Sequence, residues 1–96
     1  MEYLILAYDG EDVGAKGRRM AAREAHLAKA RALKDRGNFV CGGALLDDDG
    51  NMIGSTLYMD FEKREELDQW LETDPYTVGG VWVKIEVKPI RLALRE

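Results

Sequence analysis

Residues 39–60 read FVCGGALLDDDGNMIGSTLYMD, and this stretch decides the fold. Two apolar runs, 39–46 and 52–60, flank the polar segment 47–51, whose Asp and Gly residues tolerate the backbone of a hairpin turn. The stretch therefore predicts two antiparallel strands. Gly43 and Ser55 are small strand positions that would let a ring or a ligand approach closely.

A helix is expected on each side of this hairpin. Residues 16–36 are rich in strong helix formers, and Gly37 follows at a typical helix end. The arc of this helix that we expect to face the core consists of Met20, Leu27, Ala30 and Leu33. A second helix is expected to begin at residue 60 or 61. It should end at Asp74-Pro75, because the residue before a proline is disfavoured in helical geometry.

Two outer runs complete the order of elements. Residues 3–8 form a short apolar run, and residues 81–89 alternate between apolar and mainly charged side chains. The order strand–helix–strand–strand–helix–strand predicts a single domain over residues 1–96, of class α+β, with a ferredoxin-like βαββαβ sandwich. In this arrangement the first and third strands lie in the centre, and both helices pack on one face of the sheet.

The other face of the sheet calls for a partner. The first strand is apolar on both sides, with Ile5 and Ala7 on one and Leu4 and Leu6 on the other. Covering about 500 Å² of such a surface on each of two copies would contribute tens of kcal/mol before entropic costs. We therefore expect a homodimer through the open sheet face.

Charge and composition exclude several classes of partner. The net charge is −4 with both signs mixed along the chain, which is not typical of a nucleic-acid-binding or lipid-anchored protein. No apolar run approaches the roughly 20 residues that span a bilayer, and the first residues lack the basic region and cleavage site expected of a signal peptide. Together with the lack of a possible internal disulfide, these features favour a cytoplasmic location without nucleic-acid or membrane partners.

The single cysteine and the single histidine argue against a metal site. Cys41 lies in an apolar run, where we expect it to act as a small buried hydrophobic residue. One thiol and one imidazole are too few for a preformed zinc site within one chain. We therefore expect neither a metal nor a cofactor.

The candidate chemistry rests on His26 and Asp74. His26 points to the inner side of its helix, where the small neighbours Ala22 and Ala30 leave room for a cavity. A carboxylate beside an imidazole fixes its tautomer, so Asp74 would make a proton-handling pair with His26 if the fold brings them together. Two other interpretations stay open: His26 is a core residue satisfied by backbone groups, and Asp74 only caps or turns the chain.

The arginines near His26 also have two interpretations. Arg23 lies one turn before His26 and is a candidate contact for an anionic ligand. Its alternative role is that of a solvated charge at the surface or the rim of the site, and the same applies to Arg18 and Arg19.

The chain resembles the YCII-related (YciI-like) proteins over nearly its whole length. The segments that carry the resemblance are Arg23-Glu24-Ala25-His26, Gly42-Gly43-Ala44-Leu45, Asp49-Gly50 with Gly54-Ser55, Asp74-Pro75-Tyr76 and the closing strand. The resemblance implies a dimeric α/β barrel of ferredoxin-like subunits, with a histidine and an aspartate of the active site at His26 and Asp74. The family often has a proline where this chain has Ala44, a difference that would alter the shape of the pocket.

Most members of this family have no assigned reaction, but one is described as a dehydrochlorinase of a chlorinated aromatic diol, and the barrel resembles muconolactone isomerase. We therefore expect an isomerase or lyase that uses a His26/Asp74 dyad on a small aromatic or lactone-like molecule. The residues expected to contact this ligand are Arg23, Gly43, Ser55 and Tyr76. The alternative is a non-catalytic dimeric module that binds or senses a small molecule.

Overall fold

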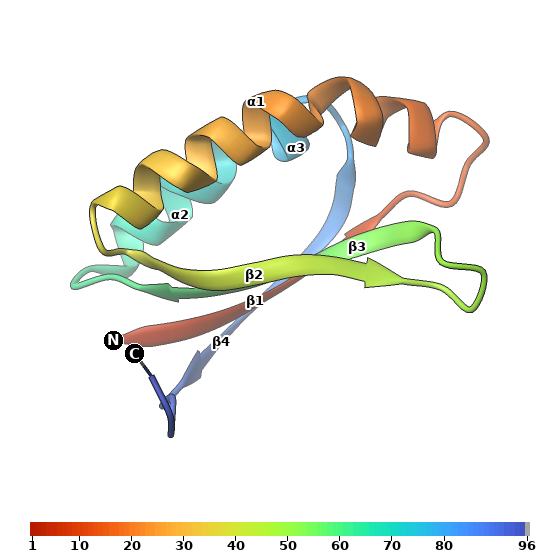
Figure 1. The fold of residues 1–96 in the computed structure, drawn as a ribbon. Helices are drawn as coiled ribbons and strands as arrows, with labels where there is room; N and C mark the ends of the chain where they lie inside the picture. The colour runs from red at the N-terminus through yellow and green to blue at the C-terminus, as the bar shows by residue number, and fades with distance from the viewer. Residues whose placement is uncertain (96) are drawn as a thin grey trace.

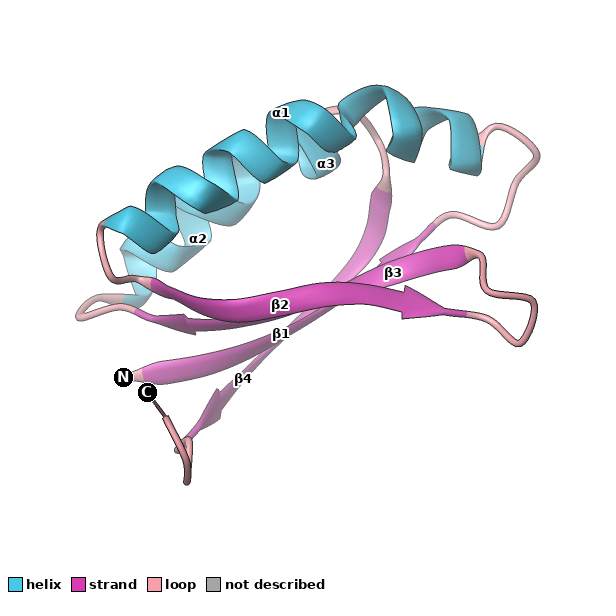
Figure 2. Cartoon of the chain, viewed as in Figure 1, coloured by secondary structure: helices cyan, strands magenta, loops and turns pink. Residues whose placement is uncertain are grey.

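The computed structural model describes residues 1–95, which form one antiparallel sheet and a layer of helices (Figures 1 and 2). The strands are β1 (Glu2–Asp9), β2 (Phe39–Leu46), β3 (Met52–Asp60) and β4 (Trp82–Ile90). The helices are α1 (Ala15–Asp35), α2 (Arg64–Thr73) and α3 (Pro75–Val78). This arrangement confirms the α+β class and the ferredoxin-like order of elements.

The sheet has the strand order β2-β3-β1-β4, so the first and third strands are central, as predicted. Ile5 of β1 lies opposite Leu57 of β3 on one side and Val87 of β4 on the other. Pro89 lies in the edge strand β4, where its missing N–H removes no hydrogen bond from the interior of the sheet.

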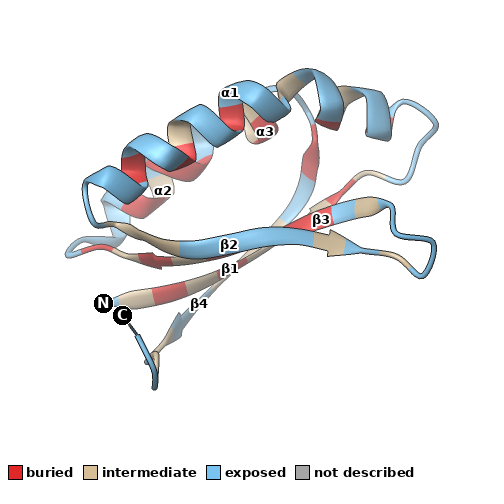
Figure 3. Ribbon diagram, viewed as in Figure 1, coloured by how far each residue is buried: buried red, intermediate tan, exposed pale blue. Residues whose placement is uncertain are grey.

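The helices all lie on one face of the sheet, and the core fills the space between the two layers (Figures 1 and 3). Alternate residues of the central strands point into this space, because side chains of a strand alternate between its faces. The most deeply buried of them are Ile5, Ala7, Leu57 and Met59, which pack with Leu33 of α1 and Leu67 of α2.

Turn chemistry sets the ends of α1 and of the central hairpin as predicted. Gly37 follows α1 with φ of 84°, and the Asn38 N–H donates to the carbonyl of Leu33. Gly50 in the hairpin turn also has φ of 84°. Glycine adopts this left-handed backbone without the steric cost that a Cβ imposes.

The second helical segment differs from the prediction at both ends. It begins at Arg64, later than expected, because the backbone N–H of Phe61 still donates to the carbonyl of Met1 beside the sheet. After Asp74 the chain forms the additional short helix α3, which was not predicted. Proline at the first position of a helix needs no N–H partner, so Pro75 ends α2 and starts α3.

The predicted core arc of α1 is partly wrong. Met20 and Leu27 are exposed, and the buried residues of α1 are Ala15, Arg19, His26, Ala30 and Leu33. The buried arc is therefore rotated relative to the apolar one. Two polar side chains, Arg19 and His26, occupy positions that would usually hold apolar residues, because each has a buried partner described below.

Cys41 was expected to be buried and is exposed. It lies opposite Tyr58 after an irregularity in the pairing of β2, on the face of the sheet that the helices leave open. The edge strand β2 is mostly exposed along its length (Figure 3). No helix in the described part of the chain is long and apolar enough to cross a membrane.

Candidate functional site

His26 and Asp74 are in direct contact. The Nδ1 atom of His26 lies 2.7 Å from Oδ2 of Asp74, and both side chains are buried. The same carboxylate oxygen accepts the backbone N–H of Tyr76 at 3.0 Å, so Asp74 also caps α3. A carboxylate only accepts hydrogen bonds, so Nδ1 carries the proton and Nε2 is the ring nitrogen that is free to exchange one.

Aromatic side chains fix the plane of the imidazole. The ring of Tyr76 stacks on His26 with centroids 4.0 Å apart, and the edge of Trp82 contacts it at 5.5 Å. The ring centroid of Trp70 lies 6.4 Å from that of His26. Burial raises the pKa of the Tyr76 phenol, although the charges of Arg19 and Arg23 act in the opposite direction. The phenol therefore stays protonated at neutral pH, and it can donate a hydrogen bond.

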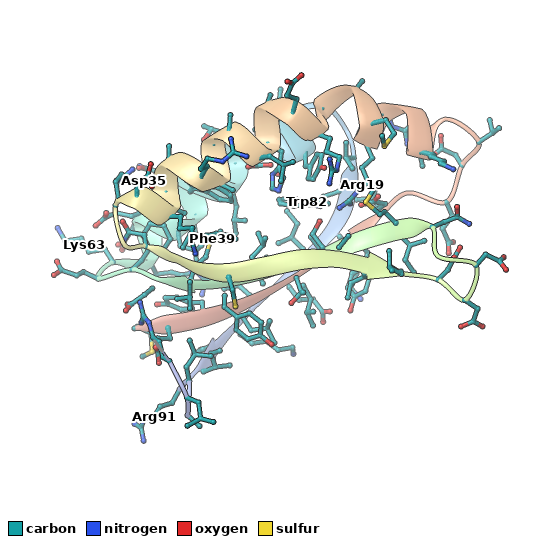
Figure 4. All side chains as sticks on the ribbon, in the orientation of Figure 1. Arg19, Asp35, Phe39, Lys63, Trp82 and Arg91 are labelled. Carbon is teal, nitrogen blue, oxygen red and sulfur yellow. The ribbon has the colours of Figure 1, made fainter. Side chains whose placement is uncertain are left out.

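A second buried polar cluster lies beside this pair. One guanidinium nitrogen of Arg19 donates to both carboxylate oxygens of Asp9, at 3.0 and 3.1 Å. The other terminal nitrogen donates to Oγ of Ser55 at 3.1 Å. The indole N–H of Trp82 donates to the same Oγ at 3.2 Å. Figure 4 shows Arg19 and Trp82 in the layer between α1 and the sheet.

The interpretation of Arg19 as a surface or rim charge is wrong, because the side chains of Arg19 and Asp9 are each only 5% exposed. Sequence reasoning also missed Asp9 and Trp82. A usable signal existed for Arg19, which lies seven residues before His26 and so on the same face of α1. Arg18 does stay near the surface, where it pairs with Asp12 and lowers the pKa of that carboxyl to about 2.

A cavity of about 370 Å³ opens between α1 and the strands β2 and β3. Its lining includes His26, Tyr76, Ser55, Arg23 and Gly43, and Asp74 lies behind the imidazole without reaching the cavity. The fold therefore brings all the predicted site residues together, five at the wall and one behind it. Apolar parts of the wall come from Ala30, Phe39 and Leu57.

Glycine and alanine make room for the cavity on β2. Gly42 lies opposite Leu57 and Ala44 opposite Ser55, so both face the helices. A Cβ on Gly42 would lie 2.7 Å from the carbonyl oxygen of Thr56 and 2.9 Å from the ring of Phe39. Gly43 lines the cavity with its backbone, because it alternates with Gly42 and Ala44 and its Cβ would point to the other face, where it would meet nothing within 4 Å. Close approach of a ligand to Gly43 stays a prediction, whereas Gly42 is approached closely by Thr56 and Phe39 of the chain itself.

The fold and the site together define a ferredoxin-like α+β protein with a buried histidine–aspartate pair beside a small cavity. The YCII-related domain matches residues 1–91, and the chain belongs to this family. It is 35% identical to protein YciI of Escherichia coli O6:H1 over 97 aligned residues, which cover 95% of this chain and 97% of the relative.

Two solved structures show the same fold. The 5-chloro-2-hydroxyhydroquinone dehydrochlorinase TftG of Burkholderia phenoliruptrix AC1100, in complex with 2,5-dihydroxybenzoquinone, has a TM-score of 0.82 and 31% identity, covering 95% of this chain and 94% of that one. Rv0793 of Mycobacterium tuberculosis has a TM-score of 0.65 at 16% identity and covers 98% and 100% of the two chains.

Proposed function

We propose that this protein is a cofactor-independent enzyme that performs acid/base chemistry on a small aromatic or lactone-like molecule. Asp74 orients His26 and stabilises its protonated form, while Nε2 of His26 takes a proton from the substrate or returns one. The reaction is an elimination or an isomerisation, because both need only a proton acceptor placed beside an acidic C–H or O–H group.

The observation that carries this proposal is the 2.7 Å contact between His26 Nδ1 and Asp74 Oδ2 at the wall of a cavity. A histidine that only filled the core would have no need of a cavity beside its ring. Nε2 makes no hydrogen bond to any side chain or backbone group of residues 1–95, so it is available to a ligand. Stacked Tyr76 holds the ring in one plane.

The electron flow of both reactions is simple. In an elimination, Nε2 removes a proton, the released electron pair forms a new double bond, and the leaving group departs with its bonding electrons. In an isomerisation, the imidazolium returns the same proton to another carbon. A positioned base of this kind contributes typically 10²–10⁴-fold to the rate.

The relatives support this class of reaction. TftG is named as a dehydrochlorinase, and loss of HCl from a chlorinated ring is an elimination. Its structure was solved with 2,5-dihydroxybenzoquinone, a planar molecule of a size that suits a cavity of about 370 Å³. These likenesses favour a planar oxygenated substrate for the present protein.

The test compares the wild type with His26→Gln on a panel of chlorinated aromatic diols and unsaturated lactones. The panel includes 5-chloro-2-hydroxyhydroquinone. Chloride release measures the elimination, and proton exchange with solvent measures the isomerisation. Turnover should fall by about 10²–10⁴-fold in His26→Gln, because the base is lost. Glu24→Gln, on the exposed side of α1, is the matched control and should keep wild-type turnover.

Two outcomes would contradict the proposal. Wild-type turnover in a folded His26→Gln protein would exclude the dyad mechanism. Tight binding of panel members without any turnover in the wild type would instead support a non-catalytic binding or sensor module.

We also propose that two copies associate through the open face of the sheet. Leu4 and Leu6 are partly exposed there, and they lie beside Tyr58 and Thr56 of β3. A packed partner would bury this apolar surface, and each subunit would keep its own cavity on the opposite face.

A further inference from the structure

The charged side chains that line the cavity are all basic. Its basic lining residues are Arg19, Arg23, Arg31 and Lys34, and its wall contains no Asp or Glu. The chain as a whole has a net charge of −4, so this wall departs from the rest of the molecule. Asp9 neutralises Arg19, but Arg23 and Arg31 form no ion pair within residues 1–95. Positive charge at a concave wall raises the local concentration of anions.

The hydroxyl of Ser55 can act only as a donor toward a ligand. A serine hydroxyl has two acceptor sites and one proton. Arg19 and Trp82 both donate to Oγ, at 3.1 and 3.2 Å, and neither side chain can accept a hydrogen bond in return. Ser55 donates to no group in the described part of the chain, so its proton is left for whatever occupies the cavity.

Ser55 is buried from bulk solvent, and the cavity is the only open space that its lining position gives it in the described part of the chain. Its neighbours across the sheet are Ala7 and Ala44, whose small side chains do not cover it. Trp82 contacts both Ser55 and the imidazole of His26, and both of these residues line the same cavity. The phenol of Tyr76, which stays protonated, adds a second donor to the same wall.

We infer that the site selects planar molecules with an anionic oxygen, a phenolate, enolate or carboxylate, and that Ser55 and Arg23 receive this oxygen. This inference rests on the proposed function, because it names the substrate class of the same site. An anionic oxygen accepts the Ser55 hydroxyl in a charge-assisted hydrogen bond, which is stronger than a neutral one. Arg23, which is exposed at the rim, supplies the opposite charge.

The apolar part of the wall distinguishes a planar organic anion from a compact inorganic one. Phe39 and Leu57 offer no polar group, and they would contact a ring while its oxygen lies near Ser55. Inorganic phosphate would interact with the same positive charge but would gain nothing from contact with this apolar surface. We therefore expect aromatic anions to bind better than inorganic phosphate.

The test measures binding without turnover, by isothermal titration calorimetry at neutral pH. Benzoate is compared with uncharged benzamide, and 4-nitrophenolate with 4-nitroanisole; inorganic phosphate is a further arm. The anionic member of each pair should bind at least about tenfold more tightly. Added salt should reduce the difference in affinity between the anionic and the neutral probe, because the charge of Arg23 is exposed to solvent and is screened.

Substitutions show which residues cause the preference for anions. Arg23→Gln and Ser55→Ala should each reduce it about tenfold, while Arg36→Gln, a matched loss of positive charge outside the cavity, should leave it unchanged. Arg23 is exposed, so its variant should fold even if Ser55→Ala is destabilised. The bound spectrum of 4-nitrophenol gives an independent readout: its ionisation should move to lower pH in the wild type and less so in Ser55→Ala.

Equal binding of charged and neutral probes, failure of every probe to bind, or an unchanged preference in Arg23→Gln would overturn the inference. A wild type that prefers anions but turns over nothing in the substrate panel would leave the inference intact and contradict only the proposed catalysis. His26→Gln should keep the preference for anions while losing turnover. This variant therefore tests the anion preference separately from the proposed catalysis.

Discussion

Asp74 performs two tasks with one carboxylate oxygen. Oδ2 accepts the backbone N–H of Tyr76 and contacts Nδ1 of His26, so the residue that starts α3 is also the partner of the imidazole. Both interpretations that the sequence left open for Asp74, a cap and a partner of histidine, therefore hold in the geometry. Because Tyr76 stacks on His26, the cap also places the ring that fixes the imidazole.

Substitutions at Asp74 should separate these two tasks. Asp74→Ala removes the cap and leaves His26 without its partner, and it should lower the free energy of unfolding by about 2–4 kcal/mol. Asp74→Asn keeps an acceptor for both N–H groups, so its stability should stay within about 1 kcal/mol of wild type. Urea denaturation at pH 7 measures both. Equal losses in the two variants would show that the charge, and not the cap, stabilises this corner.

Single residues also mark where sequence reasoning ended. His26 was correctly placed on the inner side of α1, because helical spacing alone fixes the side on which a residue lies. Arg19 lies on the same side, but the sequence offered only a ligand contact or a solvated charge for it, because its partner Asp9 belongs to another element. Burial of such a pair depends on packing between β1 and α1, which no local pattern reports.

At the level of elements, β2 decides where the cavity forms. The strand was predicted with its observed ends, Phe39 and Leu46, because apolar runs and the Asp/Gly turn are local signals. Its exposure was not predicted. Helix α1 lies over its inner face, but Gly42 and Ala44 supply no bulk there, so space remains between α1 and the strand.

Alanine at the two adjacent glycines should have opposite outcomes. Gly42→Ala places a Cβ 2.7 Å from the carbonyl oxygen of Thr56, so it should lower the free energy of unfolding by about 1–3 kcal/mol. Gly43→Ala meets nothing within 4 Å and should change stability by no more than about 0.5 kcal/mol. Thermal and urea unfolding check both values. A neutral Gly42→Ala would show that β2 moves freely enough to relieve the contact.

The short helix α3 could not be predicted for a related reason. Asp74-Pro75 is a correct stop signal for α2, but the same pair is also a start signal. Four residues, Pro75–Val78, give too short a pattern for periodicity to detect. The helix is capped by Asp74 and also makes a contact distant in the sequence, the stacking of Tyr76 on His26.

For the whole molecule, the two faces of the sheet have different surroundings. The helices lie on one face (Figure 2), and the cavity between α1 and the strands belongs to the same face. The other face presents partly exposed apolar side chains such as Leu4 and Leu6. Fold class and strand order followed from the sequence, because the order of elements restricts the possible topologies. Self-association remains a prediction of the pattern on the open face.

Leu6→Lys tests this association, because it places a charge in the centre of the open face, between Thr56 and Glu86. In analytical ultracentrifugation at micromolar concentration, the wild type should sediment as a dimer and Leu6→Lys should shift toward a monomer. Val13→Lys, at a fully exposed position away from the sheet, is the control and should remain dimeric. A monodisperse wild-type monomer would contradict the dimer.

The indoles around His26 have a practical consequence. The chain has two tryptophans, and both Trp70 and Trp82 contact the imidazole ring. Trp82 also donates its N–H to Ser55 at the cavity wall. The intrinsic tryptophan fluorescence of this protein therefore originates beside its candidate site. Ligand binding should change this fluorescence, so binding can be measured without a label.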